Sequence, residues 1–412
     1  MGLVSGGLNG RRFRITTPLP SGFRDLYLQG VRDHAFVPVP DAADAEPRFG
    51  WVDIFEPANA KFELNTFLFD RFVVLALRTD KKAVNGRYFK IALAERIAAV
   101  CEMRGVEKIS KDERGQIEEA LTSELHARAL PSVGTTDVVW DTNTGEVIVF
   151  GTSDTVVERI VTHFEATFDV RLRPERMCDW VAEKHSWEEI IGRVEKFLPD
   201  ARGGYGTGGM SDGWREDDPF EGADMPLAAD FLTWLWIQSE SADGHFRVIE
   251  GVRDTVVEDH ADEMWNDITE SLKHADLTLW LENKLKLQDI EELEQPDTAI
   301  LLGVAPSTTP AARRGLSSGK RPVEASMGLK LNDLECRLTI TATGTGVVFG
   351  GLKLPFEVKQ GQEEKIFERM LLLDLVHGTL KKLFQSYFLD RTSEAWASKV
   401  ETWLNDVDLA AK

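Results

Sequence analysis

The sequence of 412 residues has few cysteines and no long apolar run. Its three cysteines, Cys101, Cys178 and Cys336, are far apart and odd in number, so they build neither an intrachain disulfide framework nor a zinc site of four cysteines. No stretch of about 18 apolar residues occurs, and no apolar run of signal-peptide length follows the arginines near the N-terminus. These absences predict a soluble protein of a reducing, cytoplasmic compartment with no membrane partner.

Basic residues are also fewer than acidic ones. The chain has 48 Lys and Arg and 69 Asp and Glu, which gives a formal net charge of −21. A chain with this total is repelled as a whole by phosphate backbones and anionic lipid. Apolar residues are plentiful at 42%, with 22 Phe and 11 Trp, which is a globular rather than a disordered composition. At roughly 150 residues per domain, the length predicts two or three domains.

The acidic residues are concentrated in one part of the chain. Residues 255–297 hold 13 acidic and 3 basic side chains, whereas residues 71–128 hold 9 acidic and 12 basic, and residues 311–330 hold 1 and 5. At physiological salt, charges more than about 8 Å from a binding site are largely screened, so an acidic protein can still contain a basic groove. The candidate DNA-binding residues are the basic residues of the positive segments, namely Lys81, Lys82, Arg87, Lys90, Arg128, Arg313, Arg314, Lys320 and Arg321.

The first half of the chain predicts strands followed by two helices. Short apolar runs separated by Pro and Gly favour strands, at 13–15, 36–39, 50–55 and 72–77. Apolar residues recur at helical spacing from Tyr88 to Arg104, and Gly105 is a typical helix stop. A second helix is predicted from Ser110, which forms a capping box with Glu113, until Pro131 ends it.

The next segment predicts a hairpin and a third helix. Residues 138–140 and 147–150 are strand-like on either side of a turn with Gly145, and Ser153 or Asp154 caps a helix that ends before a returning strand at 168–172. Mixed helices and antiparallel sheets in two or three subdomains follow, an α+β fold.

Composition divides the chain into four regions. We expect an N-terminal α+β region at 1–198, a Gly-rich and acidic linker at 199–226, an acidic and mainly helical insertion at 227–304, and a C-terminal α+β region at 305–412. In the last region, residues 305–322 predict a loop, residues 329–343 and 347–354 predict strands, and residues 362–389 predict a long amphipathic helix or helix pair.

No motif predicts an enzyme or a cofactor. Residues 203–213 are Gly-rich but lack the Lys-Ser/Thr of a P-loop, and residues 231–236 favour core packing over base stacking. Glu124 and His126, near Arg128, are more typical of structural roles than of acid–base catalysis. One alternative is a metal-dependent DNA nuclease, with ligands from Asp259, His260, Asp262, Glu263 and Asp267. Another is an interaction protein whose acidic segment mimics DNA.

An ordered series of short motifs indicates a family. It comprises Phe49-Gly50-Trp51-Val52; the strand 72–77 followed by Lys81-Lys82-Ala83-Val84; 111–114 leading into 124–130; Trp140-Asp141-Thr142 with Gly145; and, later, Gly319-Lys320 followed by 327–331. In this order and spacing the chain resembles the RdgC family of bacterial recombination-associated proteins.

The resemblance implies a ring-shaped homodimer that encircles double-stranded DNA without sequence preference. It also implies a nucleoid-associated location, a function in recombination or replication, and limited access of the strand-exchange recombinase to DNA, with no chemistry of its own. The sequence departs from the family in two places. Leu130 stands where the family has a phenylalanine that contributes to DNA binding, and Val304 and Ala305 stand where it has a basic pair. The acidic middle has no clear counterpart.

Overall fold

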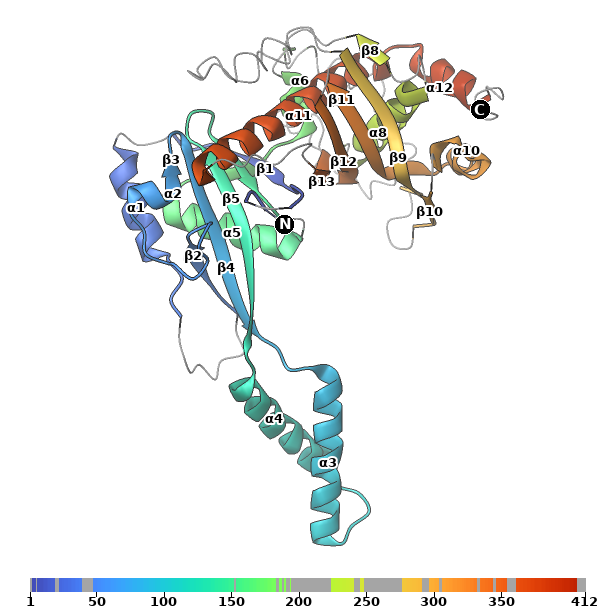
Figure 1. The fold of residues 1–412 in the computed structure, drawn as a ribbon. Helices are drawn as coiled ribbons and strands as arrows, with labels where there is room; N and C mark the ends of the chain where they lie inside the picture. Colours follow the sequence, from blue (N-terminus) through green and yellow to red (C-terminus); the bar gives the residue numbers. More distant parts are fainter. Residues whose placement is uncertain are drawn as a thin grey trace, which may run out of the picture. The chain divides into compact units, whose positions relative to one another are not determined.

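The chain folds into two compact units. The structure, a computed structural model, describes residues 2–4, 6–18, 22–38, 47–151, 153–182, 185–186, 189, 193, 224–240, 245–247, 276–290, 296–303, 306–331, 334–343, 346–353 and 361–405. The N-terminal unit comprises residues 15–149 and 153–172, and the C-terminal unit comprises residues 1–14, 150–152 and 173–412. Both contain helices and an antiparallel sheet, which confirms the α+β fold class (Figure 1).

A seven-stranded sheet organises the N-terminal unit, with the strand order β2-β4-β5-β6-β1-β7 and β3 beside β4. The chain passes from one unit to the other within β1 and β7. The elements are β1 (Arg11–Ile15), α1 (Phe23–Asp33), β2 (Arg48–Val52), α2 (Leu64–Phe67), β3 (Leu68–Phe69), β4 (Phe72–Lys82), α3 (Gly86–Arg104), α4 (Lys111–Arg128), β5 (Pro131–Asp141), β6 (Glu146–Val149), α5 (Asp154–Phe168) and β7 (Leu172–Pro174).

Aromatic side chains fill the core where α1 and α5 pack together. The fully buried Trp140 ring contacts Tyr27 at 5.2 Å, and Phe164 and Phe168 at 5.7 and 5.4 Å between centroids. Gly30 of α1 lies against the Thr167 carbonyl of α5, in a space that a β-carbon would need. Glycine, which has no β-carbon, therefore lets the two helix backbones approach this closely, although glycine is unfavourable inside a helix.

The helices α3 and α4 form a hairpin that projects from the end of the β4–β5 ribbon (Figure 1). The Asn85 side chain caps α3 by accepting from the Arg87 and Tyr88 amides, and Gly105 ends it with φ 64°. Ser110 and Glu113 form the predicted capping box of α4. Arg96 pairs with Glu124 and Arg104 with Glu113, so charge as well as apolar contact joins the two helices.

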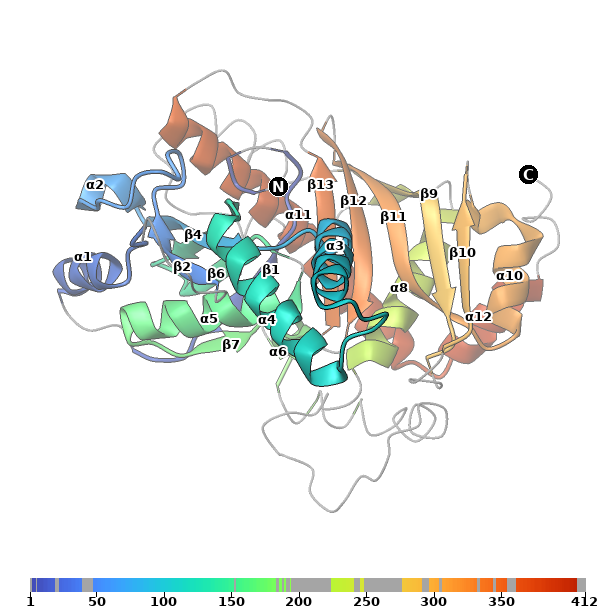
Figure 2. The same ribbon diagram turned by 90° about the horizontal axis from the view of Figure 1, so that it is seen from below.

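A six-stranded sheet organises the C-terminal unit, with the order β10-β9-β11-β12-β13 and β8 beside β9. The helix α8 packs on one face of this sheet (Figure 2). The elements are α6 (Met177–Ala182), α8 (Asp224–Glu240), β8 (His245–Arg247), β9 (Asp276–Gln288), β10 (Thr298–Leu302), the 3₁₀-helix η4 (Pro306–Thr308), α10 (Pro310–Ser317), β11 (Arg321–Leu331), β12 (Leu334–Thr343), β13 (Gly346–Lys353), α11 (Gln362–Arg391) and α12 (Trp396–Asn405).

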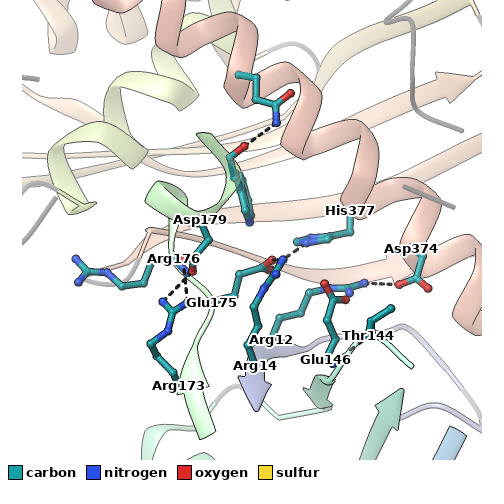
Figure 3. Close-up of polar contacts among 12 residues, drawn as sticks. Arg12, Arg14, Thr144, Glu146, Arg173, Glu175, Arg176, Asp179, Asp374 and His377 are labelled. Atoms are coloured by element: carbon teal, nitrogen blue, oxygen red, sulfur yellow. Dashed lines mark hydrogen bonds and ion pairs between the residues drawn. The ribbon is translucent and has the colours of Figure 1, made fainter. Parts of the chain in front are cut away.

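A buried charge cluster joins β1, the residue after β7 and α11 within the C-terminal unit (Figure 3). The Glu175 side chain is 4% exposed, with one oxygen 3.1 Å from His377 Nε2 and the other accepting from Arg14 at 3.4 Å. Arg12 donates to Asp374 at 2.8 Å. Burial alone would raise the pKa of Glu175, but the charges of His377, Arg12 and Lys381 outweigh it and hold that pKa well below its ordinary value.

Several expectations about the secondary structure were wrong. Residues 23–33 are helix α1 within a region where only strands were expected. Of the strand expected at 36–39, the described residues 36–38 form no strand, and the neighbouring Ala35 makes a single bridge with Trp51. Phe168 ends α5, and the returning strand begins only at Leu172. The segment expected as a loop at 305–322 contains α10, with the Thr309 side chain as its cap.

Pairing between the described strands also joins regions that the composition had divided into separate domains. Within 227–304, expected as a mainly helical insertion, β9 lies at the centre of a sheet and pairs with β11 of the C-terminal region. The linker expected at 199–226 falls outside the described residues up to 223, and α8 begins at Asp224. The helix α11 is longer than expected and is buried on nearly all sides rather than amphipathic. Among the described residues, no helix combines the length and apolar character needed to cross a bilayer.

Replacing Gly30 by Ala tests the close approach of α1 and α5. The added methyl group meets the Thr167 carbonyl oxygen, so we expect the free energy of unfolding to fall by about 1–3 kcal/mol. The control is Gly115→Ala in α4, where a β-carbon has open space and a gain of up to about 1 kcal/mol is expected. Chemical denaturation measures both. Equal effects of the two changes would contradict the packing argument.

Replacing Glu175 by Gln tests the buried cluster. The change leaves buried cations without their carboxylate, so we expect a loss of about 3–5 kcal/mol in the free energy of unfolding at pH 7. A glutamate with a depressed pKa stabilises the fold above its ordinary pKa of 4.5, and this contribution is lost as pH falls below 4.5. Stability of the wild type should therefore decline more steeply with acid than that of the variant.

The control is Glu189→Gln, at an exposed glutamate that pairs with His185 and Arg193. It should stay close to the wild type at neutral pH, since exposed pairs contribute little. Parallel acid profiles for Glu175→Gln and the wild type would show that Glu175 has no depressed pKa.

Candidate nucleic-acid interface

Five of the nine predicted basic residues lie at the junction between the helical hairpin and the β4–β5 ribbon. Lys81 and Lys82 are the last residues of β4 and pair with Ser132 and Pro131 of β5. The helix α3 begins after the cap at Asn85, and α4 ends three residues before β5 begins. The junction thus brings together residues almost fifty positions apart in sequence. We term the residues at this junction the neck patch; its basic members are Lys81, Lys82, Arg87, Lys90 and Arg128.

Within the described part of the chain, three of the five charges of the neck patch are uncompensated. Lys81, Arg87 and Lys90 are exposed and have no carboxylate within ion-pair distance among the described residues. The nearby acid Asp80 accepts two hydrogen bonds from Arg78, at 2.8 and 2.7 Å, and this pairing raises the pKa of Arg78. Arg128 is paired with Glu124 at 3.1 Å, but its side chain is 75% exposed. The patch can therefore attract a polyanion without first breaking buried contacts.

Exposed apolar side chains accompany these cations. Tyr88 and Ile91 lie in the first turns of α3, Val133 lies in β5, and all three are more than half exposed. Leu130, which stands where the family has a phenylalanine, is 89% exposed between α4 and β5. Leu130 was named through the family resemblance, but Tyr88, Ile91 and Val133 were missed, because exposed apolar residues leave no periodic pattern. Leu130 can still offer an apolar contact at the neck, although it has no aromatic ring for stacking.

Arg313 is buried and bonded within the C-terminal unit. Its side chain is buried, donates to Glu240 at 2.7 Å and to the Trp403 carbonyl at 2.6 Å, and lies over the Trp403 ring at 4.5 Å. Its place on the inner side of α10 corrects the expectation that it binds DNA. Charge counting missed this because Glu240 and Trp403 are distant in sequence.

The other three C-terminal candidates are not equivalent either. Arg314 is exposed on α10, whereas Lys320 is paired with Asp297 and its side chain is 15% exposed. Arg321, at the start of β11, lies 3.8 Å from Asp230. Only Arg314 is fully open to solvent in this group.

The residues of two alternative sites, for acid–base catalysis and for base stacking, have structural roles. Glu124 pairs with both Arg96 and Arg128, which leaves it bound to the hairpin rather than poised beside His126. Residues 231–236 of α8 are buried, with Phe231 packed against Tyr387 and Phe384 of α11, so their core role is confirmed. Glu175 and His377 are each under 10% exposed and offer no access to a substrate.

The residues of the nuclease alternative, from Asp259 to Asp267, lie outside the described part of the chain, as do residues 203–213. Within the part that the structure does describe, no three His, Cys, Asp or Glu side chains are grouped closely enough to hold a metal ion.

Comparison with known proteins gives one family. Residues 9–189 match the model of the family described as "Putative exonuclease, RdgC". No curated protein matches the sequence. The match covers the whole neck patch and both helices of the hairpin, and it ends before α8. Residues 9–189, a little under half of the chain, are therefore similar to the RdgC family.

Proposed function

We propose that this protein binds double-stranded DNA without sequence preference, through its phosphates, and has no catalytic activity of its own. The observation that carries the proposal is the neck patch, where Lys81, Arg87 and Lys90 are exposed without ion-pair partners among the described residues. Similarity to the RdgC family supports a recombination-associated function. In this function the protein modulates homologous recombination or replication by limiting the access of the strand-exchange recombinase to DNA.

The chemistry of the neck patch favours phosphate contacts over base recognition. Lysine is a flexible point charge, and its contacts with phosphate release counterions without reading sequence. The exposed Leu130 and Tyr88 add apolar surface that can pack against sugars or a widened groove.

We further propose that the active form is a ring-shaped homodimer. Support comes from the projecting hairpin, whose tip exposes Met103 at 78% and Val106 at 44%. Apolar residues at the end of a projecting element are typical of a contact with another molecule. A second copy of the chain would bury them and close a path around the duplex.

Replacing Lys81, Arg87 and Lys90 together by Gln tests the neck patch. Because each lost phosphate contact removes about 0.9 from the slope of log affinity against log salt, the slope should become shallower by up to about 3. Binding should weaken equally for unrelated duplex sequences. Fluorescence anisotropy with labelled duplex at several NaCl concentrations measures both quantities.

A matched control carries the same loss of charge elsewhere, with Lys61, Lys365 and Lys399 replaced by Gln. Lys61 and Lys365 have no ion-pair partner among the described residues, and Lys399 has only the exposed partner Asp390. Wild-type binding without salt dependence would refute phosphate-directed recognition, and equal slopes for the two triple variants would refute the neck patch.

Encirclement has its own test. A closed ring can slide off a short linear duplex but is retained on a circle, so we expect slower dissociation from circular DNA. Equal dissociation rates would contradict the ring and leave DNA binding intact.

The second candidate function is a metal-dependent nuclease, which the family description favours. Its candidate ligands are Asp259, His260, Asp262, Glu263 and Asp267. Incubation of the pure protein with labelled DNA and Mg²⁺ or Mn²⁺ separates the two functions. Degradation that His260→Ala abolishes would establish the nuclease.

A further inference from the structure

The sheet of the C-terminal unit has two chemically different faces. Leucines, methionine and isoleucine such as Leu279, Met327 and Ile340 alternate along its strands and are buried on the side that α8 covers. Side chains of the other face are half-exposed or exposed, and we term it the open face. Strand pairing places Lys330 opposite Thr278 and Glu335, and Arg337 opposite Gly328 and Lys353, which defines the members of this face.

Positive charge predominates on the open face, although the whole chain carries −21. Its acidic members are Glu282, Glu324 and Glu335, and its basic members are Lys284, Lys286, Lys330, Arg337 and Lys353. Lys284 pairs with Glu324, and Arg337 lies 3.4 Å from Glu282 and 3.2 Å from Glu335. Lys286, Lys330 and Lys353 have no carboxylate within ion-pair distance among the described residues.

One pairing within this face places two cations opposite each other, although Glu282 and Glu335 offset part of the charge of Arg337. Arg337 and Lys353 are direct partners across β12 and β13, and both are exposed. Like charges directly opposite each other destabilise an antiparallel pair. An anion that binds between them removes this repulsion.

Hydroxyl groups lie between the cations. Ser326 and Thr339 are cross-strand partners with their oxygens 3.3 Å apart, and Thr341 and Thr278 extend the same face. Hydroxyls and lysines are the side chains that contact phosphate oxygens of DNA. Of the described residues on this face one is aromatic, Trp280, whose ring edge lies over Gly328 and whose Nε1 donates to Glu282 at 2.9 Å.

We propose that the open face is a second surface of this protein that contacts the phosphates of duplex DNA, apart from the neck patch. The proposal rests on the proposed function and adds a contact surface in the region beyond the family match. A single aromatic ring, already bonded to Glu282, is a poor platform for unpaired bases, which require stacking. Charge complementarity with the sugar–phosphate backbone therefore selects the duplex as the occupant.

The test replaces the three unpaired lysines, Lys286, Lys330 and Lys353, by Gln in the full chain. We expect the salt slope of duplex binding to become shallower by up to about 3, with weaker binding of every sequence alike. Thermal unfolding should be unchanged, because these lysines have no ion-pair partners to lose among the described residues. The matched control is again Lys61→Gln with Lys365→Gln and Lys399→Gln.

A variant that makes the open face more positive separates a lost DNA contact from misfolding, because its affinity for duplex should rise. Glu335→Gln removes an exposed carboxylate from beside Arg337 and should tighten duplex binding and steepen the salt slope. If the neck variant loses affinity while the Lys286, Lys330 and Lys353 variant and Glu335→Gln both match the wild type, the open face does not contact DNA and the proposed function stands. A wild-type chain that does not bind duplex in a salt-dependent manner overturns both.

Discussion

The antiparallel pairing of β4 with β5 is the constraint on which the candidate interface depends. Eleven consecutive residue pairs run from Phe72 with Asp141 to Lys82 with Pro131. The first six residues of β4 are buried in the core, while β2 pairs with β4 only as far as Asp80. The last pairs of the ribbon thus extend beyond the core and hold the helical hairpin. A shift of one residue would turn every side chain of the ribbon to the opposite face.

Local burial, rather than total charge, decides which cations are open to solvent. Arg12, Arg313 and Arg369 are buried and bonded within the C-terminal unit, where they stabilise the fold. Carboxylate partners are absent, among the described residues, for Lys81 and Lys90 at the neck and for Lys286, Lys330 and Lys353 on the open face. Strand pairing positions all of these lysines except Lys90, which lies on α3. A cation bonded to a buried acid has already lost its hydration and cannot be recruited by phosphate without a large cost.

The two proposed surfaces share one physical design. Each is placed at the end or on the uncovered side of an antiparallel sheet, where backbone pairing fixes the position of flexible lysines. Such surfaces bind a polyanion through counterion release and tolerate any sequence. They differ in their neutral side chains, because the neck adds apolar Leu130 and Tyr88 while the open face adds Ser326 and Thr339.

The sequence alone determined part of the local structure and the family resemblance. Capping by Ser110, the glycine stop at Gly105 and the Gly145 hairpin follow from short-range backbone chemistry, so they were predicted correctly. The sequence also marked five of the neck cations, because they flank two helices. Tertiary structure decided the rest. The alternating leucines of β9 lie in an acidic segment, whose charge masked the strand pattern. The helix α1 packs against α5 through Gly30, and Arg313 is buried beside Glu240. These outcomes depend on partners distant in sequence, and no local pattern encodes which groups will meet.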